Sequence, residues 1–359
     1  MRVVVFGASG YAGAELVRIL DGHPDFELVG ASAGANAGAE IGAIYPHLKH
    51  SRYGSLRLVG NDELAASIDT LGAEVAFFAM PHTQAASLVP RLLESLRLAV
   101  DLSADFRLAD PRLYESVYGF VHPAPELLEE AVYGLVELKR GELSRARLIA
   151  APGCYVTATT LALFPFFDRG VVAPGSVPIA NAVSGISGAG RSAKLGNLFG
   201  EIDSDVSAYG LSGHRHRPEI EQNVGSPVLF VPHLVPMTRG ILSTCYFDVA
   251  PDALSSAGLE DGSSRLLVEE MLHSELEAFY QGEAFVSVLE PGSSPHTKAT
   301  LGTNMAILSV SYDPASGKAV VLSALDNMIK GASGQAVQAA NVALGLDEGA
   351  GLTRVSVYP

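Results

Sequence analysis

The feature that most constrains this chain is the alternation of short apolar runs with helical stretches over its first 150 residues. The first run, at 3–6, is followed by GASGYAG and by a segment with apolar residues at helical spacing. Further runs occur at 26–31, 75–80, 98–102 and 148–151. Continuous apolar runs are typical of parallel strands buried on both faces, and their alternation with helices indicates βαβ units. The first part of the chain is therefore predicted to be a doubly wound α/β domain.

The texture of the sequence changes after about residue 155. Longer alternating runs appear, VPIANAVSG, PVLFVPHLV, GILSTCYFDVA and NMAILSVSYD, which predict a mixed or antiparallel sheet with one covered face. Residues 266–280 have the pattern of an amphipathic helix. The segment 327–346 predicts a second helix, rich in small residues, that closes back onto the first domain.

Charge and cysteine content exclude several classes of protein. The 359 residues carry a formal net charge of −15, which argues against nucleic acid or an anionic membrane as the main partner. Two cysteines far apart do not make a disulfide framework, and no metal-ligand spacing is present. With no signal-peptide pattern and no apolar run of membrane-spanning length, we expect a soluble cytoplasmic protein without a metal.

Three glycines, Gly7, Gly10 and Gly13, separate the first apolar run from its helix. Glycines there allow a tight turn and close approach of a pyrophosphate to the helix N-terminus. The spacing also occurs in turns that only pack a strand on a helix, but its place at the start of a βαβ series favours a dinucleotide site. After the second run no acid appears before Glu40, and Ser32 is a small hydroxyl instead. An absent acid removes repulsion against a 2′-phosphate, so we predict NADP rather than NAD.

Ligands of open parallel sheets bind beyond the carboxyl ends of the strands, so the segments 7–9, 81–82, 103–107 and 152–154 are candidates for a site. Cys154 follows Pro-Gly and precedes YVTATTLAL, which is predicted to be helical. A thiol near a helix N-terminus ionises more readily and is a better nucleophile, whereas a buried cysteine is usually inert. We predict that Cys154 is a nucleophile and that Cys245, inside an alternating run, is structural.

A thiol nucleophile also needs a proton carrier. The segment GHRHRPEI contains His214 and His216. A solvated basic turn is the plainest explanation of such a run, and residues two apart in an extended segment face the same side. Spacing therefore does not choose between the two histidines. Guanidinium and ammonium groups that are candidates for binding substrate anions are Arg107, Arg191, Lys194, Arg215 and Arg217.

Taken in order, GASGYAG, PH after VAFFAM, DLSADFRL, APGCYVTA, NAVSGISGAGR, GHRHRPEI, VPMTRGIL and DNMIKGASGQAVQ resemble the N-acetyl-γ-glutamyl-phosphate reductases of arginine biosynthesis. The resemblance extends from residue 3 to about 346. PGCY and HRHRPEI are its specific motifs, because the glycine turn is shared with many reductases. The family is similar to the aspartate-semialdehyde dehydrogenases.

The resemblance implies a Rossmann domain at 1–153 and 326–359, completed by the C-terminal helix, and an α+β catalytic and oligomerisation domain at 154–325. It implies an NADPH-dependent reduction of an acyl phosphate through a cysteine thioester, in a homo-oligomer (a dimer or tetramer) that binds a small-molecule substrate. Cys154 would be the nucleophile and His214 the acid/base, with His216 as the alternative. The residues expected near the cofactor are Gly7, Ser9, Gly10, Tyr11, Ala12, Gly13, Ser32, Pro81, His82, Ser184, Gly185 and Asn327. Those expected near the substrate are Arg107, Arg191, Arg215 and His216.

Three alternatives are open at this point. The carrier-linked aminoadipyl or glutamyl phosphate reductases of lysine biosynthesis are similar overall, but their cysteine is usually followed by Asn, where Tyr155 stands here. An aspartate-semialdehyde dehydrogenase would use the same chemistry on a free amino acid, and the HRHRPEI block argues against it. A non-catalytic NADP sensor would need neither a poised thiol nor a second basic cluster.

Overall fold

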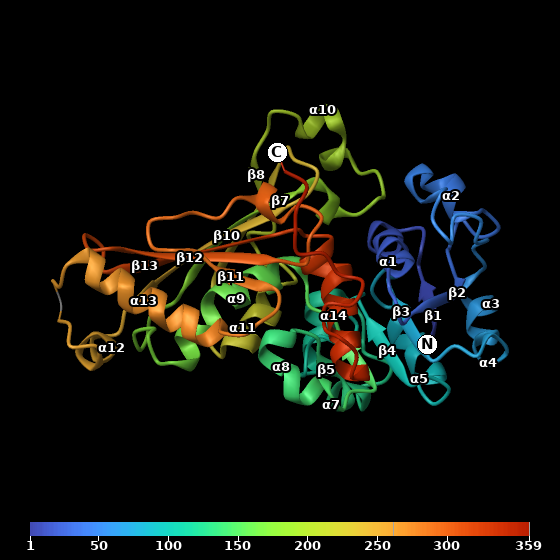
Figure 1. Cartoon of the computed structure of the whole chain (residues 1–359), viewed down its shortest axis with the longest axis horizontal. Coiled ribbons are helices and arrows are strands. Elements are labelled where there is room, and N and C mark those ends of the chain that lie inside the picture. The colour runs from blue at the N-terminus through green and yellow to red at the C-terminus, as the bar shows by residue number, and fades with distance from the viewer. Residues whose placement is uncertain (261, 359) are drawn as a thin grey trace. The chain divides into compact units, whose positions relative to one another are not determined.

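The computed structural model describes residues 1–260 and 262–358, and the chain forms two compact units (Figure 1). Unit 1 contains Met1–Gly153 and Ala332–Thr353, and unit 2 contains Cys154–Gly331 together with 354–358. The sequence placed the chain's return to the first domain between 325 and 326, whereas the units divide between 331 and 332. It also assigned the last residues to the first domain, whereas 354–358 group with unit 2.

Unit 1 is built on a six-stranded sheet in the order β2-β1-β3-β4-β6-β5, in which every pair is parallel. Its strands are β1 (Arg2–Phe6), β2 (Glu27–Ala31), β3 (Val75–Phe78), β4 (Leu98–Asp101), β5 (Val132–Tyr133) and β6 (Leu148–Ala150). Every residue of the two central strands, β3 and β4, is buried. This burial explains why their sequences are almost continuously apolar. The predicted doubly wound parallel sheet is confirmed.

Helices follow the strands of unit 1, as expected for βαβ connections. They are α1 (Tyr11–Asp21), α2 (Ile41–Ile44), η1 (Pro46–Leu48), α3 (Asn61–Ala66), α4 (Ile68–Leu71), α5 (Ala85–Leu92), α6 (Arg112–Tyr118), α7 (Leu127–Glu130), α8 (Val136–Leu143) and α14 (Gly334–Leu344). A π-helical turn, η5 (Ile329–Ser333), leads into α14. The strand that follows β1 in the chain, β2, lies on one side of it, and the next strand, β3, lies on the other side. The strand order therefore reverses direction between β1 and β3, and this position is a topological switch point.

The C-terminal helix α14 packs in unit 1 beside α8 and β4, as predicted (Figure 1). Its buried face carries three fully buried amides, Gln335, Gln338 and Asn341. Gln335 Nε2 donates to the Gly134 carbonyl at 2.8 Å, and Gln338 Nε2 donates to Glu137 at 3.0 Å. Each of the three amide nitrogens has an acceptor, so most of this buried polar face is satisfied, whereas Gln335 Oε1 has no hydrogen-bond partner among the described residues.

Unit 2 is built on a seven-stranded sheet in the order β11-β12-β13-β10-β7-β9-β8. Its strands are β7 (Ile179–Gly185), β8 (Ser207–Ala208), β9 (Leu229–Val235), β10 (Ile241–Asp248), β11 (Val286–Val288), β12 (Ala306–Asp313) and β13 (Lys318–Leu325). β7–β9 and β11–β12 are parallel and the other pairs antiparallel, so the predicted mixed sheet is confirmed. The sequence interpretation missed β13, although KAVVLSAL alternates as a strand should.

Helices cover one face of this sheet. α9 (Cys154–Asp168) packs on β10 and β13, and α13 (Arg265–Tyr280), predicted at 266–280, packs on β12 (Figure 1). The remaining helices are η2 (Ile186–Ala189), η3 (Leu195–Asn197), α10 (Phe199–Ile202), α11 (Arg217–Val224), α12 (Pro251–Ser256) and η4 (Thr297–Thr300). Along β10 the residues facing the helices are buried and the alternate ones are half-buried. Within residues 1–260 and 262–358, no helix is long and apolar enough to cross a membrane.

Candidate active site

The turn between β1 and α1 has the geometry of a dinucleotide cradle. Gly7 has φ +81°, and a Cβ there would lie 2.5 Å from the Ala79 carbonyl oxygen. A Cβ on Gly13 would lie 2.3 Å from the Gly7 oxygen. At Gly10 the nearest atom would be 3.5 Å away, so chain packing does not require glycine at that position. Gly10 is the N-cap of α1 without a side-chain hydrogen bond, and helix amides that no side chain caps can bind a pyrophosphate.

The neighbours of these glycines differ in exposure. Tyr11 is exposed, Ser9 and Ala12 are half-buried, and the Ser9 carbonyl accepts a hydrogen bond from Tyr45. Ser32 is fully buried: its hydroxyl donates to Asn61 at 2.6 Å and accepts the Gly7 amide at 3.3 Å. Ser32 therefore supports the glycine turn from behind.

An arginine that the sequence did not indicate lies beside the loop after β2. The Arg57 side chain is exposed, and its Nη2 atom is 3.9 Å from the point where a Cβ would stand on Gly38. A short pairing of Glu40 with Arg57 holds the two segments together. Because Gly38 and Arg57 are about twenty residues apart in the chain, no local sequence pattern indicated that they lie close together.

Pro81 and His82 are exposed in the loop that follows β3, and Ala79 of the same loop lies against the glycine turn. The fully buried Asp105 carboxylate fixes this loop by accepting the Thr83 amide at 2.7 Å and the Ala86 amide at 2.9 Å. Thr83 has φ +79°, a strained conformation for a β-branched residue. The carboxylate thus couples the loop after β3 to the loop after β4.

Arg107 is almost fully buried within unit 1, at 8% exposure. Its Nε donates to the Ala151 carbonyl at 2.7 Å and its Nη2 donates to the Leu102 carbonyl at 2.9 Å. Burial, and the nearby Asp105 charge, raise the pKa of the neighbouring Asp101 to about 6. Through its hydrogen bond to the Ala151 carbonyl, Arg107 anchors the chain three residues before Cys154, a role that the sequence did not indicate.

Cys154 is the first residue of α9 and is half-buried, and it forms no disulfide. Behind it stands Gly331, where a Cβ would lie 2.7 Å from the Cys154 Cβ. Cys245 is fully buried in β10, and burial raises the pKa of its thiol to about 12. Its predicted structural character is confirmed.

Tyr155 links the start of α9 to the histidine turn. Its ring is buried, and its hydroxyl donates to the His233 carbonyl at 2.9 Å. The His214 ring packs edge-on against Tyr155 at 5.9 Å between centroids, and the His216 ring lies 6.2 Å from Tyr155. Tyr209 and Phe230 complete the cluster around His214, at 5.5 and 5.4 Å. Unit 2 therefore brings both candidate histidines to the residue that follows Cys154.

The two histidines differ in what holds them. His214 Nδ1 accepts the His216 amide at 3.1 Å, which assigns the proton of the neutral ring to Nε2. Burial, with a smaller contribution from the charge of Arg215, lowers the pKa of His214 to about 4. His216 is the N-cap residue of α11 and is 6% exposed. Arg215 is exposed, whereas Arg217 is bound to Glu221 at 2.8 Å.

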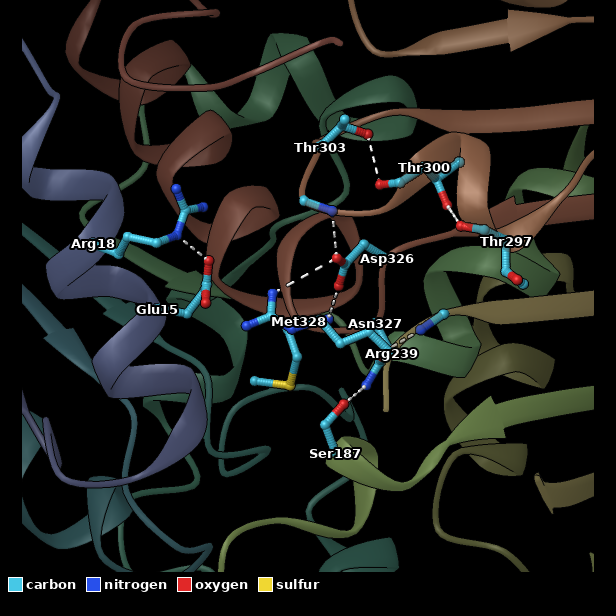
Figure 2. A network of polar contacts seen from close by, with 12 residues as sticks. Glu15, Arg18, Ser187, Arg239, Thr297, Thr300, Thr303, Asp326, Asn327 and Met328 are labelled. Carbon is cyan, nitrogen blue, oxygen red and sulfur yellow. Dashed lines mark hydrogen bonds and ion pairs between the residues drawn. The ribbon is translucent and has the colours of Figure 1, made fainter. Parts of the chain in front are cut away.

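Ser184 and Gly185 are the last two residues of β7, and Asn327 binds Ser187, which follows them (Figure 2). Asn327 Nδ2 donates to the Ser187 hydroxyl at 2.9 Å, and its Oδ1 accepts the Gly240 amide at 2.8 Å. Ser184 and Asn327 are each 2% exposed. A Cβ on Gly185 would lie 2.8 Å from the Thr238 backbone, so glycine permits this close approach. Both Arg191 and Lys194 are exposed on the segment after η2.

Comparisons with known proteins bear on the two domains and on the fold. Residues 2–146 match the family model described as semialdehyde dehydrogenase, NAD binding domain, and 154–327 match the one described as semialdehyde dehydrogenase, dimerisation domain. Aspartate semialdehyde dehydrogenase II of Vibrio cholerae, solved in complex with ASA, has the same fold: the TM-score is 0.68 at 15% identity, over 96% of this chain and 98% of that one. The Candida albicans enzyme solved with NADP gives a TM-score of 0.62 at 14% identity, over 95% and 97%.

Sequence relatives are much closer. N-acetyl-gamma-glutamyl-phosphate reductase of Dehalococcoides mccartyi is 43% identical, over 99% of this chain and 98% of its own length. The Rhodospirillum rubrum protein of that name is also 43% identical, over 100% and 99%. A probable chloroplastic one from Oryza sativa is 39% identical, over 100% and 83%. The chain belongs to the N-acetyl-γ-glutamyl-phosphate reductase family, with the two domains of the semialdehyde dehydrogenases.

Proposed function

We propose that this chain catalyses the NADPH-dependent reduction of N-acetyl-γ-glutamyl phosphate to N-acetylglutamate 5-semialdehyde and phosphate, a step of arginine biosynthesis, through a thioester on Cys154. The observation that carries the proposal is the half-buried Cys154 at the first position of α9, followed by a tyrosine that packs against His214. Membership of the reductase family supplies the substrate class.

Cys154 Sγ attacks the acyl carbon, forming the C–S bond while the C–O bond to phosphate breaks. Amides at the start of α9 have no partner within the helix and can stabilise the oxyanion that develops. NADPH, when bound, supplies the hydride that reduces the thioester carbon. The C–S bond then breaks, the semialdehyde leaves, and the sulfur regains its proton.

His214 is the residue that we assign to hold this proton, as the resemblance implies. Its neutral ring carries hydrogen on Nε2, so it can give a hydrogen bond to sulfur or to the substrate oxygen, and it transfers this proton only as Nδ1 takes up another. Accepting a second proton at Nδ1 requires release of the His216 amide. His216 is the alternative, and it also serves as the N-cap residue of α11.

NADPH binding rests on the open helix N-terminus at Gly10 and on the loop after β2. That loop has no acid before Glu40 and has the exposed Arg57 beside it, which suits a 2′-phosphate. The exposed residues Tyr11, Pro81 and His82 line the same strand ends. Ser184, Gly185 and Asn327 are proposed to lie near the nicotinamide. Arg107, Arg191, Arg215 and His216 remain candidates for the substrate anions.

We also propose that the chain works as a homodimer in the cytoplasm. The family model that matches 154–327 is described as a dimerisation domain. The sheet face of unit 2 that the helices do not cover carries half-buried apolar side chains in adjacent strands: Ile179, Tyr246 and Val320 lie opposite one another, as do Val183 and Leu242. An apolar face of this kind is typical of an interface between subunits.

The proposal is tested by the reverse reaction, phosphate-dependent reduction of NADP or NAD with N-acetylglutamate semialdehyde. Cys154→Ser should lose at least about 10³-fold in kcat, because the thiolate is the nucleophile. Cys245→Ala is the matched control and should stay near wild type, since that thiol is buried in the sheet. NADP should be preferred over NAD, and aspartate semialdehyde should be a poor substrate. Near-wild-type turnover by the serine variant would contradict the covalent route.

A further inference from the structure

Cys154 and Gly331 are in contact although they are far apart in sequence. The chain enters unit 2 at Cys154 and first leaves it at Gly331. A Cβ on Gly331 would lie 2.7 Å from the Cys154 Cβ, 3.1 Å from its Cα and 3.3 Å from Leu325 Cδ1. The first of these distances is shorter than any ordinary carbon contact. Glycine is therefore required here by close packing against the proposed nucleophile.

The turn that carries Gly331 is held by Asp326, which is fully buried (Figure 2). Asp326 Oδ1 accepts the Met328 amide and its Oδ2 accepts the Gly302 amide, both at 2.8 Å. Arg239 Nη1 lies 3.7 Å from the same Oδ2 and balances the buried charge. Since both carboxylate oxygens bind backbone amides, the start of the turn has one defined conformation.

The Asp326 main chain continues this support up to Gly331. Its carbonyl oxygen accepts the Ile329 amide at 3.2 Å and the Gly331 amide at 3.0 Å. The second bond spans five residues and opens the π-helical turn η5. Asp326 thus fixes the position of Gly331, and Gly331 in turn packs on the Cα and Cβ atoms of Cys154, which set the direction of the thiol.

We propose that Gly331 is a positioning residue for Cys154, and that Asp326 holds the turn that brings Gly331 into place. The inference rests on the proposed function, because it requires Cys154 to be the nucleophile. A side chain at 331 displaces the Cys154 Cα–Cβ bond or the turn, and so moves Sγ relative to the acyl carbon. Small misplacements of a reacting group reduce the rate of the chemical step far more than they reduce substrate binding.

The test is Gly331→Ala in the full-length protein. The expected result is a fall in kcat of about tenfold or more with KM values for semialdehyde, phosphate and NADP within about threefold of wild type. The second-order rate of Cys154 alkylation by iodoacetamide should also fall. Gly141→Ala is the matched control: Gly141 lies in α8, a Cβ there meets nothing within 4 Å, and its kcat and alkylation rate should be unchanged.

A second variant, Asp326→Asn, carries the test if Gly331→Ala does not fold. Its amide nitrogen cannot accept a backbone amide, so the turn loses one of its bonds, and kcat should again fall with KM preserved. Wild-type kcat and alkylation in the variant that folds would overturn the inference. If Cys154→Ser is inactive while these variants match wild type, the inference alone fails; if Cys154→Ser is active, the proposed function fails first.

Discussion

His214 combines two observations at the residue scale: a ring held in one tautomer, and a pKa lowered by burial to about 4. A histidine whose pKa is lower in the folded state than in the unfolded one stabilises the fold above the unfolded value of about 6.5. That contribution is lost as the pH falls from about 6.5 toward 4. At neutral pH the ring is therefore a neutral Nε2–H donor, suited to giving a hydrogen bond to sulfur.

We predict that His214 stays neutral from pH 8 down to about pH 5 in the folded enzyme. Long-range ¹H–¹⁵N spectra of the imidazoles should show its signals, assigned by comparison with His214→Gln, in the Nε2–H tautomer over this range. In the same variant kcat should fall by about 10²-fold or more. Titration of these signals between pH 6 and 7 would show that burial does not control this ring.

Most residues to which the proposed function assigns a role at this scale were named from the sequence, and their roles stay predictions. Cys154, His214 and the glycine turn follow from position relative to strands and from motif resemblance, and they remain the assigned residues. No pattern in the sequence showed that the buried Arg107 guanidinium binds two backbone carbonyls, and its contact with a substrate anion stays a prediction. Arg57, Asp326 and Gly331 were not foreseen, because their significance lies in contacts with residues distant in sequence.

At the scale of elements, patterns of hydrophobicity predicted five of the six strands in the unit 1 sheet, since each of these five was a continuous apolar run. The two-residue strand β5 is too short for any period to appear. α14 was hard to assess for another reason. Its buried face includes amide side chains, so the spacing of its apolar residues predicts less burial than the structure has. Asn341 is the clearest case, since Oδ1 accepts from His23 Nε2 at 3.0 Å and Nδ2 donates to the Glu348 and Ala350 carbonyls.

We predict that Asn341→Leu destabilises the protein by about 2–4 kcal/mol, because each buried group left without a partner costs about 1–3 kcal/mol. Urea unfolding followed by circular dichroism would measure the change, and kcat per folded molecule should be preserved. His23→Ala serves as the control in a double-mutant cycle, where a coupling of about 0.5 kcal/mol or more is expected. Additive effects would mean that the bond between the two side chains contributes little.

At the scale of the whole molecule, the unit 2 sheet gives an expectation about assembly. Tyr246 lies within the apolar rows of the face that helices leave uncovered. A lysine there would place a charge in the centre of the proposed interface. Tyr246→Lys should therefore shift the mass seen by light scattering from about twice 37.5 kDa to the mass of one chain. Val121→Lys, at a position 76% exposed in unit 1, should leave the mass unchanged. An unchanged dimer in the Tyr246 variant would exclude this face.

The contact between Cys154 and Gly331 also bears on how such a chain can arise and be rebuilt. Because the first and last residues of the segment 154–331 touch, the segment has the form of a cassette whose two ends meet at one place. A segment whose two ends lie close together can be inserted into another chain, or removed from it, without moving the flanking residues of that chain apart. A segment exchanged in this way would carry Cys154 at its junction with the first unit.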